Sequence, residues 1–379
     1  MGLRGNFLFK SLDRYIGISL IWFLGLFTHK SKKLPEKIDS ILIIKLSALG
    51  DTILLMPILR ALRDKYPKAK ITAICTKINL DVLKVCPYIN EVLIINIRNL
   101  VFNPFSIIKL FKNKKFDLAL DFDQWTRISP LLAFFSGALY RIGFKTNNQY
   151  RHYLYTHFVE HSQTKHELDC FADILKVLEI KNINKNLEFW VDDASKHHSE
   201  KLLLENGLKQ GDAFIVFHPE TPLHGGQRQW PAEKYVELGK KLSELNKFKI
   251  LIAGTEIEKE QNSKIVNALL PNAFLMHSLS LGEYAAILSK AKMFISGNTG
   301  IMHLASALNI PVIALHGPTN PKKWGPLGNK SRVIKSKAEC SPCLYLGFEY
   351  GCKTNKCMQD ISVDEVFEEA KKVANSIPN

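Results

Sequence analysis

The chain has 379 residues, enough for two domains with cores of their own, because a single hydrophobic core usually stops growing at about 250–300 residues. Seven cysteines are too few for a disulfide scaffold, which favours a reducing compartment, and 46% hydrophobic with 23% charged residues is typical of a soluble globular protein. The formal charge of +15 attracts anionic lipid, phosphorylated substrates or nucleic acid, but no helix-turn-helix, zinc-finger or aromatic RNA-binding motif accompanies it, so we expect no nucleic acid partner.

The first 36 residues are predicted to form a membrane-associating segment. Residues 15–27 (YIGISLIWFLGLF) are nearly all apolar and have basic residues on both sides. As a helix they would span about 20 Å, less than the roughly 30 Å of a bilayer's hydrocarbon core. No small-residue cleavage site follows, which argues against a signal peptide, and a buried helix of the main domain is the alternative. The basic flanks and Trp22 favour a helix that lies in the interface of the cytoplasmic leaflet.

Residues 37–190 alternate between strand and helix patterns. The first strand is a short apolar run, followed by the turn LSALGD and then by helical apolar spacing. The expected elements are a strand at 41–45, a helix at 52–66, a strand at 70–75, a helix at 79–85, strands at 92–95 and 118–122, and an apolar segment at 131–139. This alternation predicts an α/β fold of parallel strands joined by right-handed crossovers.

A polar stretch at 191–212 is expected to join the two lobes, and residues 191–379 repeat the alternation. The expected strands are 214–217, 249–253, 293–295 and 312–315, and the expected helices are 232–246, 258–269, 281–291, 300–308 and 363–376. The last helix could pack back on the first lobe. Two Rossmann-like lobes that face a cleft would place ligands at the carboxyl ends of the strands in both halves.

The strongest motif of the second lobe is SGNTGIMHLA, at residues 296–305, where a strand runs through a glycine turn into a helix. Asn298 or Thr299 can cap that helix while the other N–H groups of its first turn stay available. Those N–H groups and the positive end of the helix dipole favour a diphosphate, and Gly297 and Gly300 let it approach the backbone. A plain capped helix is the alternative, because helix caps are common.

Two further strand ends of this lobe carry similar chemistry. The sequence HGPTNP at 316–321 is followed by Lys322 and Lys323, and HPET at 218–221 ends the first strand of the lobe. Arg228 precedes the next helix. Because the carboxyl ends of parallel strands meet at one edge of a sheet, these segments are expected to converge on one phosphate site.

In the first lobe, Asp51 lies in the first strand-to-helix turn. A carboxylate in this place could accept the proton of a hydroxyl nucleophile as a general base. The alternative is that Asp51 only caps the helix, as most aspartates before helices do.

Three separated segments resemble one family: ILIIKLSALGDTILLMPILRAL, the Trp230-Pro231 block and GNTGIMHLASALNIPVIALHGPTNPKKWGP. They are similar to the glycosyltransferases that add heptose to the inner core of bacterial lipopolysaccharide, glycosyltransferase family 9, over roughly residues 38–362. The resemblance implies a GT-B fold, an ADP-heptose donor in the C-terminal lobe and an anionic lipid-linked saccharide acceptor in the N-terminal lobe. It also implies a cytoplasmic enzyme that is peripheral on the inner face of the bacterial inner membrane.

The resemblance assigns roles to donor-site residues. Arg228 stands where the family more often has a lysine, and arginine keeps the charge but changes the geometry. Asn298 stands where the family has an aspartate before Thr-Gly, which leaves the donor sugar open. The donor-binding residues that the resemblance implies are Thr221, Arg228, Glu258, Asn298, Thr299, Gly300 and His303, with Glu258 at the nucleoside and His303 near the diphosphate.

The implied mechanism is direct displacement with inversion, which requires no metal or other cofactor. Asp51 matches the family's catalytic aspartate and takes the acceptor proton, while the donor-site residues stabilise the charge on the departing ADP. Ser47, Arg127 and Arg141 are expected to meet the acceptor, although single arginines on α/β surfaces are usually only solvated.

Two groups of residues raise the question of a metal. Asp121 and Asp123 form an Asp-x-Asp sequence, but a pair of carboxylates supplies fewer oxygen ligands than hard cations normally take. The spacing of Cys340, Cys343, Cys352 and Cys357 permits a structural zinc, and packed thiols are the alternative.

Two other functions fit parts of the pattern. A sugar-nucleotide epimerase of the same fold would use the donor site without an acceptor. A basic protein that binds anionic membrane surfaces without catalysis would explain the charge and residues 15–27.

Overall fold

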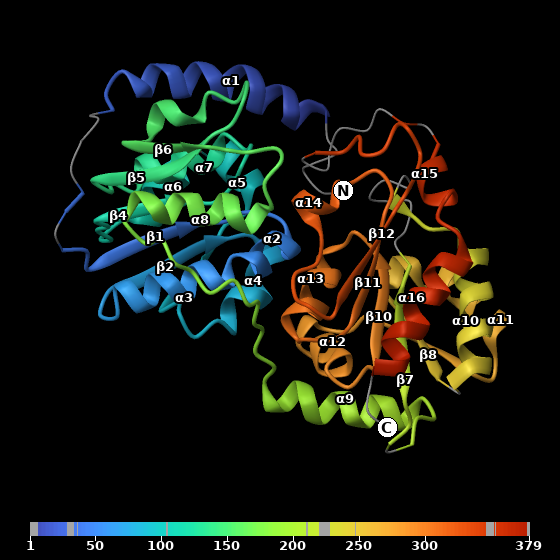
Figure 1. The fold of residues 1–379 in the computed structure, drawn as a ribbon. Coiled ribbons are helices and arrows are strands. Elements are labelled where there is room, and N and C mark those ends of the chain that lie inside the picture. Colours follow the sequence, from blue (N-terminus) through green and yellow to red (C-terminus); the bar gives the residue numbers. More distant parts are fainter. Residues whose placement is uncertain are drawn as a thin grey trace. The chain divides into compact units, whose positions relative to one another are not determined.

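The computed structural model describes residues 7–28, 34–35, 37–103, 105–209, 211–219, 228–246, 248–345, 352 and 354–376 (Figure 1). The chain divides into two compact units, Met1–Lys185 and Asn186–Asn379, close to the predicted boundary at residue 190. The polar stretch predicted as a junction is mainly a helix of the second unit, α9 (Asp193–Glu205). The Asp192 side chain starts this helix by accepting a hydrogen bond from the amide of Ser195.

The first unit is built on a six-stranded parallel sheet with the order β3-β2-β1-β4-β5-β6. Its strands are β1 (Ser40–Ile44), β2 (Lys70–Cys75), β3 (Glu91–Ile94), β4 (Leu118–Asp121), β5 (Tyr140–Lys145) and β6 (His157–Glu160). Helices cover both faces of the sheet, which explains why the central strands are continuous apolar runs (Figure 1). The α/β prediction is confirmed for this unit.

The helices of the first unit after the first strand are α2 (Leu49–Leu54), α3 (Met56–Lys65), α4 (Lys77–Lys84), α5 (Ile97–Phe102), α6 (Phe105–Phe111), α7 (Ile128–Phe135) and α8 (Glu167–Val177), with a 3-10 turn, η2 (Arg151–Leu154). The single helix predicted at 52–66 is wrong, because the structure has two helices there. Pro57 lies at the start of α3 and has no N–H to donate to the preceding turn, so the first helix ends before it.

The N-terminal helix α1 (Phe7–Gly25) packs on the first unit along η2 and α7. Ile21 is fully buried against Leu131 and Leu154. Elsewhere on α1, large apolar side chains are exposed, among them Tyr15 and Trp22. Among the described residues, no helix combines the length and apolarity that crossing a bilayer requires.

The second unit repeats the strand order of the first, as β12-β11-β10-β7-β8-β9. Its strands are β7 (Phe214–His218), β8 (Lys249–Gly254), β9 (Ala273–His277), β10 (Met293–Gly297), β11 (Val312–His316) and β12 (Ser331–Lys335). Its helices beyond α9 are α10 (Ala232–Asn246), α11 (Lys259–Leu269), α12 (Leu281–Leu288), α13 (Gly300–Ala307), α14 (Pro321–Trp324), α15 (Lys356–Gln359) and α16 (Val363–Ser376), with a 3-10 turn, η5 (Glu256–Glu258).

The last helix belongs to the core of the second unit. Val366 and Ala370 of α16 are fully buried in the apolar cluster that includes the strands of the sheet, and α16 lies against α10. The apolar stripe of this helix is therefore covered within its own unit, and packing back on the first lobe stays a prediction.

In each sheet the direction of strand addition reverses at one point, between β1 and β4 in the first unit and between β7 and β10 in the second. Open parallel sheets bind ligands outside the carboxyl ends of their strands at such a reversal. Both segments predicted to carry chemistry, residues 45–51 and 297–303, follow a strand that borders it.

Candidate functional site

Asp51 lies at the carboxyl edge of the first sheet, in the first turn of α2. The residue that caps this helix is Ala48, which has no side-chain cap, so Asp51 is not the N-cap. Its Oδ2 instead accepts hydrogen bonds from Lys45 Nζ at 3.2 Å and from Gln124 Nε2 at 3.1 Å. The carboxylate is thus held from two sides near the positive end of a helix, where negative charge is stabilised.

Lys45 connects the two strands that border the reversal in the first sheet. Its ammonium group is fully buried and lies 3.3 Å from the Phe122 carbonyl, 3.5 Å from Asp123 and 3.3 Å from Gln124 Oε1, in addition to its contact with Asp51. A buried cation is tolerated only when it is paired and hydrogen-bonded. Lys45 is therefore the counter-ion of both Asp51 and Asp123.

The Asp-x-Asp sequence points its two carboxylates at different partners. Asp123 accepts from the amide of Leu46 at 2.8 Å and from the Ser47 hydroxyl at 3.4 Å. Asp121 pairs with Arg151 at 2.8 Å in a fully buried contact. Burial raises the pKa of the Asp121 carboxyl, and the Arg151 charge opposes that rise. The arrangement gives these aspartates structural partners rather than a shared metal.

Arg127 and Arg141, predicted to bind the acceptor, are buried and have structural partners. Arg127 Nη1 lies 2.6 Å from Asp13 of α1, and its Nε and Nη2 donate to loop carbonyls. Arg141 donates to the carbonyls of Leu154 and Ala138, and burial lowers the pKa of its guanidinium. Each of these bonds ties the arginine to its own unit, so both arginines help to hold the first unit together, and the acceptor role predicted for them gains no support.

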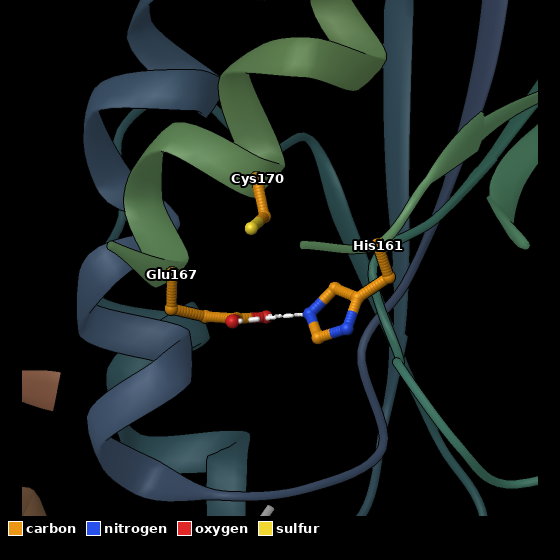
Figure 2. A group of neighbouring side chains, drawn as sticks. All are labelled: His161, Glu167 and Cys170. Carbon is orange, nitrogen blue, oxygen red and sulfur yellow. Dashed lines mark hydrogen bonds and ion pairs between the residues drawn. The ribbon is translucent and has the colours of Figure 1, made fainter. Parts of the chain in front are cut away.

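Three residues at this edge have no counterpart in the sequence motifs. Gln124 follows β4 and bridges Asp51 to Glu167, the first residue of α8, and His161 follows β6 and contacts Glu167 (Figure 2). Gln124 and His161 thus follow the two strands that flank β5, and Glu167 begins the helix that comes after β6. Their position after strands is the only sequence signal, and it cannot be used until the strand order is known.

In the second unit, β10 leads through Asn298 and Thr299 into α13. Thr299 is the N-cap, and its hydroxyl accepts a hydrogen bond from the backbone amide of Met302 at 3.2 Å. The side-chain amide of Asn298 donates to the Trp324 carbonyl at 3.5 Å. The first four N–H groups of a helix have no partner within it, and Thr299 satisfies one of them. The helix start at Gly300 can therefore still donate to an anion.

Three histidines lie near this helix start. His218 ends β7, beside Ser296 in the register, His316 ends β11, and His303 is buried in α13. Burial lowers the pKa of His218, and it lowers the pKa of His316 to about 4. Both rings are therefore neutral near pH 7 and can donate or accept hydrogen bonds without a charge.

The other predicted donor residues lie near the same edge or outside the described part of the chain. Glu258 follows β8, accepts from the amide and hydroxyl of Thr255, and its charge acts on His218. Arg228 is half-buried and comes two residues before Trp230, whose indole donates to the Ile361 carbonyl at 3.1 Å. Thr221 lies outside the described residues.

The four C-terminal cysteines lie near one another. Burial, together with the charges of Cys340, Cys343 and Cys352, raises the pKa of Cys357 to about 11. Within the described ranges, however, only His161, Glu167 and Cys170 bring three ligand atoms within 4.8 Å of one another. The cysteines are thus neighbours without ligand spacing, and the zinc site stays a prediction.

Comparisons with known proteins agree on one family. The model of glycosyltransferase family 9 (heptosyltransferase) matches residues 105–354, well over half of the chain. Lipopolysaccharide heptosyltransferase 2 of Escherichia coli K12 is 24% identical over 307 residues, which cover 78% of this chain and 87% of that protein.

Solved structures share the fold. A family 9 glycosyltransferase from Veillonella parvula superposes with a TM-score of 0.80 at 20% identity, over 91% of this chain and all of that chain. The heptosyltransferase WaaC of E. coli, solved with ADP-2-deoxy-2-fluoro heptose, superposes with a TM-score of 0.65 at 18% identity, over 88% of this chain and 99% of its own. With the same strand order in both units and the predicted motifs at both strand reversals, the family match shows that this chain is a glycosyltransferase of family 9, the heptosyltransferases.

Proposed function

We propose that the protein transfers a heptose, or a similar sugar, from an ADP-sugar to the lipopolysaccharide core or a related lipid-linked saccharide, with inversion at the anomeric carbon. The observation that carries the proposal is Asp51, which is held by Lys45 and Gln124 at the strand reversal of the first sheet. The family supports heptose transfer, and the WaaC structure with a fluorinated ADP-heptose supports ADP as the nucleotide.

On the acceptor side, Asp51 acts as the general base. Its carboxylate accepts the proton of the acceptor hydroxyl while that oxygen forms a bond to the anomeric carbon. The bond from the same carbon to the diphosphate breaks, and its electron pair leaves with ADP. Ser47 lies on the same turn, where its hydroxyl donates to Asp123 at 3.4 Å, and its role as an acceptor contact is part of the proposal.

On the donor side, the amides at the start of α13 and the positive end of its dipole hold the diphosphate. Arg228 adds a full positive charge, and His303 adds a donor from the same helix. These groups stabilise the charge that builds on the departing ADP, which is usually the largest electrostatic contribution to such a reaction. Asn298 is neutral where the family has an aspartate, so the start of α13 carries one negative charge less and accepts donors that a carboxylate would repel.

A transfer assay tests this function. Wild-type protein is incubated with ADP-heptose and a Kdo–lipid A acceptor, and ADP release and the acceptor mass are measured. The proposal predicts one added heptose per acceptor and loss of both signals in Asp51→Ala. ADP-heptose turnover without acceptor would instead identify an epimerase, and equal turnover by Asp51→Ala would remove Asp51 from the mechanism.

We also propose that the protein is cytoplasmic and lies peripherally on the inner face of the inner membrane through α1. The exposed apolar side chains of this helix support the placement, since Tyr15, Ile16, Trp22 and Phe23 are each more than half exposed, as is Leu26 directly after the helix. The positive net charge adds attraction to anionic headgroups.

Vesicle flotation tests the placement. The wild type is expected to float with phosphatidylglycerol vesicles and Trp22→Ser/Phe23→Ser to stay behind. Ile257→Ser, which removes an equally exposed apolar side chain from the second unit, is the matched control and should float. Equal flotation of the wild type and the double variant would refute the role of α1.

A further inference from the structure

A buried chain of hydrogen bonds leads from Asp51 into the first unit. Gln124 Nε2 donates to Asp51 Oδ2 at 3.1 Å and to Glu167 Oε1 at 2.7 Å. His161 Nε2 lies 3.1 Å from each carboxylate oxygen of Glu167, as Figure 2 shows. Gln124 is 3% exposed, and Glu167 is fully buried, so water does not compete for these bonds.

The contacts fix the orientation of the Gln124 amide. Lys45 Nζ lies 3.3 Å from its Oε1, so the oxygen faces a donor and the nitrogen faces two carboxylates. An amide nitrogen carries two hydrogens, one for each carboxylate. The reversed amide would set its oxygen against both carboxylates and its nitrogen against the ammonium group, which removes three hydrogen bonds.

Glu167 is fixed in turn by its two donors. A carboxylate can only accept, so the His161 Nε2 that contacts both of its oxygens must carry a hydrogen. With the Gln124 amide on one oxygen and His161 across both, the carboxylate has one orientation. Any turn of Glu167 would pull the Gln124 amide with it or break the 2.7 Å bond.

A metal site is the competing explanation, because His161, Glu167 and Cys170 have ligand atoms within 4.8 Å of one another. The 3.1 Å contacts between His161 and Glu167 are those of direct hydrogen bonds, and the Cys170 thiol donates to the Ser162 carbonyl at 3.5 Å. Figure 2 shows the thiol set apart from the His161–Glu167 pair. Zinc would also need a fourth ligand or a water.

We infer that Gln124, Glu167 and His161 are positioning residues that hold Asp51 Oδ2, so that the other carboxylate oxygen, Oδ1, receives the acceptor proton. The inference rests on the proposed role of Asp51 as the base. Within the described residues, both hydrogen bonds to the Asp51 side chain reach Oδ2. Glu167 and His161 act on Asp51 only through the Gln124 amide, and none of the three takes the proton.

Substitutions at Glu167 separate positioning from packing. Glu167→Gln keeps an oxygen that accepts from Gln124, whereas Glu167→Leu removes it. In the transfer assay we expect kcat of Glu167→Leu to fall roughly 10- to 100-fold, since small misplacements of a reacting group cost rate of this order. The KM for ADP-heptose should stay within about twofold, and Glu167→Gln should regain most of kcat.

Cys170→Ala is the matched control, because Cys170 lies one turn further along α8, is equally buried and donates its thiol hydrogen to the Ser162 carbonyl. It should keep the wild-type kcat, and metal analysis of all variants should find no ion that depends on His161. Gln124→Met, which keeps the volume and loses the bridge, replaces Glu167→Leu if that variant does not fold, and should lose kcat to the same extent.

The outcomes are distinguishable. Wild-type kcat in Glu167→Leu or Gln124→Met, with Asp51→Ala inactive, would overturn the positioning chain and leave Asp51 as the base. Activity in Asp51→Ala would overturn the proposed function itself. If Cys170→Ala lost kcat as Glu167→Leu does and a bound metal disappeared with it, the three residues would be metal ligands and the inference would be wrong.

Discussion

The carboxyl edges of the two sheets follow the same strand order and are built from different chemistry. The edge of the first unit gathers buried charges. Lys45 lies between Asp51 and Asp123, and Gln124 links Asp51 to a third carboxylate, that of Glu167. The edge of the second unit holds a helix start and neutral histidines, of which His316 has a pKa of about 4. One edge is suited to moving a proton and the other to holding an anion.

This difference explains how one topology serves both halves of a transfer reaction. A base must be an ionised group with a fixed orientation, which demands counter-ions and amide donors around it. A diphosphate already carries its charge, so it needs N–H donors, a helix dipole and positive charge rather than a base.

The largest expected effect is on stability, at Lys45. Lys45→Met leaves two buried carboxylates without their counter-ion, so the free energy of unfolding should fall by about 3–5 kcal/mol. Lys37→Met is the control, because Lys37 pairs with Asp39 at 2.7 Å but is 82% exposed, and its free energy of unfolding should match that of the wild type. Urea denaturation measures the stability of both variants. Equal stability of Lys45→Met and the wild type would show that Lys45 does not stabilise the two carboxylates.

An intermediate effect is expected at the donor helix. Thr299→Ala removes the hydroxyl that orders the start of α13, so ADP should bind about tenfold more weakly, while Thr299→Ser should bind as the wild type does. Calorimetric titration with ADP measures this. If Thr299→Ala lost stability but bound ADP unchanged, the helix would be only a capped helix and the contrast between the two edges would fail.

A smaller effect concerns pH and the neutral histidines. His316 has a pKa of about 4 when folded and near 6.5 when unfolded, so the unfolded state binds more protons between these values. Stability should therefore fall as pH drops from about 6.5 toward 4, by on the order of 1 kcal/mol per pH unit from this group.

In the wild type the Thr319 hydroxyl lies 3.0 Å from His316 Nδ1. His316→Asn removes the titrating ring and keeps an amide beside this hydroxyl. Urea denaturation at neutral pH and near pH 5 should show a shallower loss of stability in this variant. An unchanged pH slope would mean that the ring is charged in the folded protein.

The sequence was sufficient for strands with continuous apolar runs and for motifs that lie within one strand-turn-helix unit. The turn that carries Asp51 and the helix start at Gly300 are such local units, and the structure has both. The strands that were missed lack a run that is both apolar and buried. β6, β9 and β12 are edge strands with partly exposed residues. In β5, Arg141 and Gly143 interrupt the apolar sequence.

The partners of Asp51 could not be predicted in the same way. Gln124 is 73 residues away in the chain and becomes a neighbour only because β4 pairs with β1. The buried ion pair of Arg127 could not be predicted for the same reason, since its partner Asp13 is 114 residues away and no local pattern distinguishes a buried arginine from a solvated one. Local sequence predicts the groups that begin a site, and strand order decides what surrounds them.

The most direct test of the account measures binding and turnover separately in Asp51→Asn, which keeps the shape of the side chain and removes its charge. We predict that ADP-heptose binds within about twofold of the wild type, because the proposed donor site lies in the second unit, and that transfer falls by about 10²–10⁴. Transfer near the wild-type rate, or loss of ADP-heptose binding, would contradict the division of roles between the two edges.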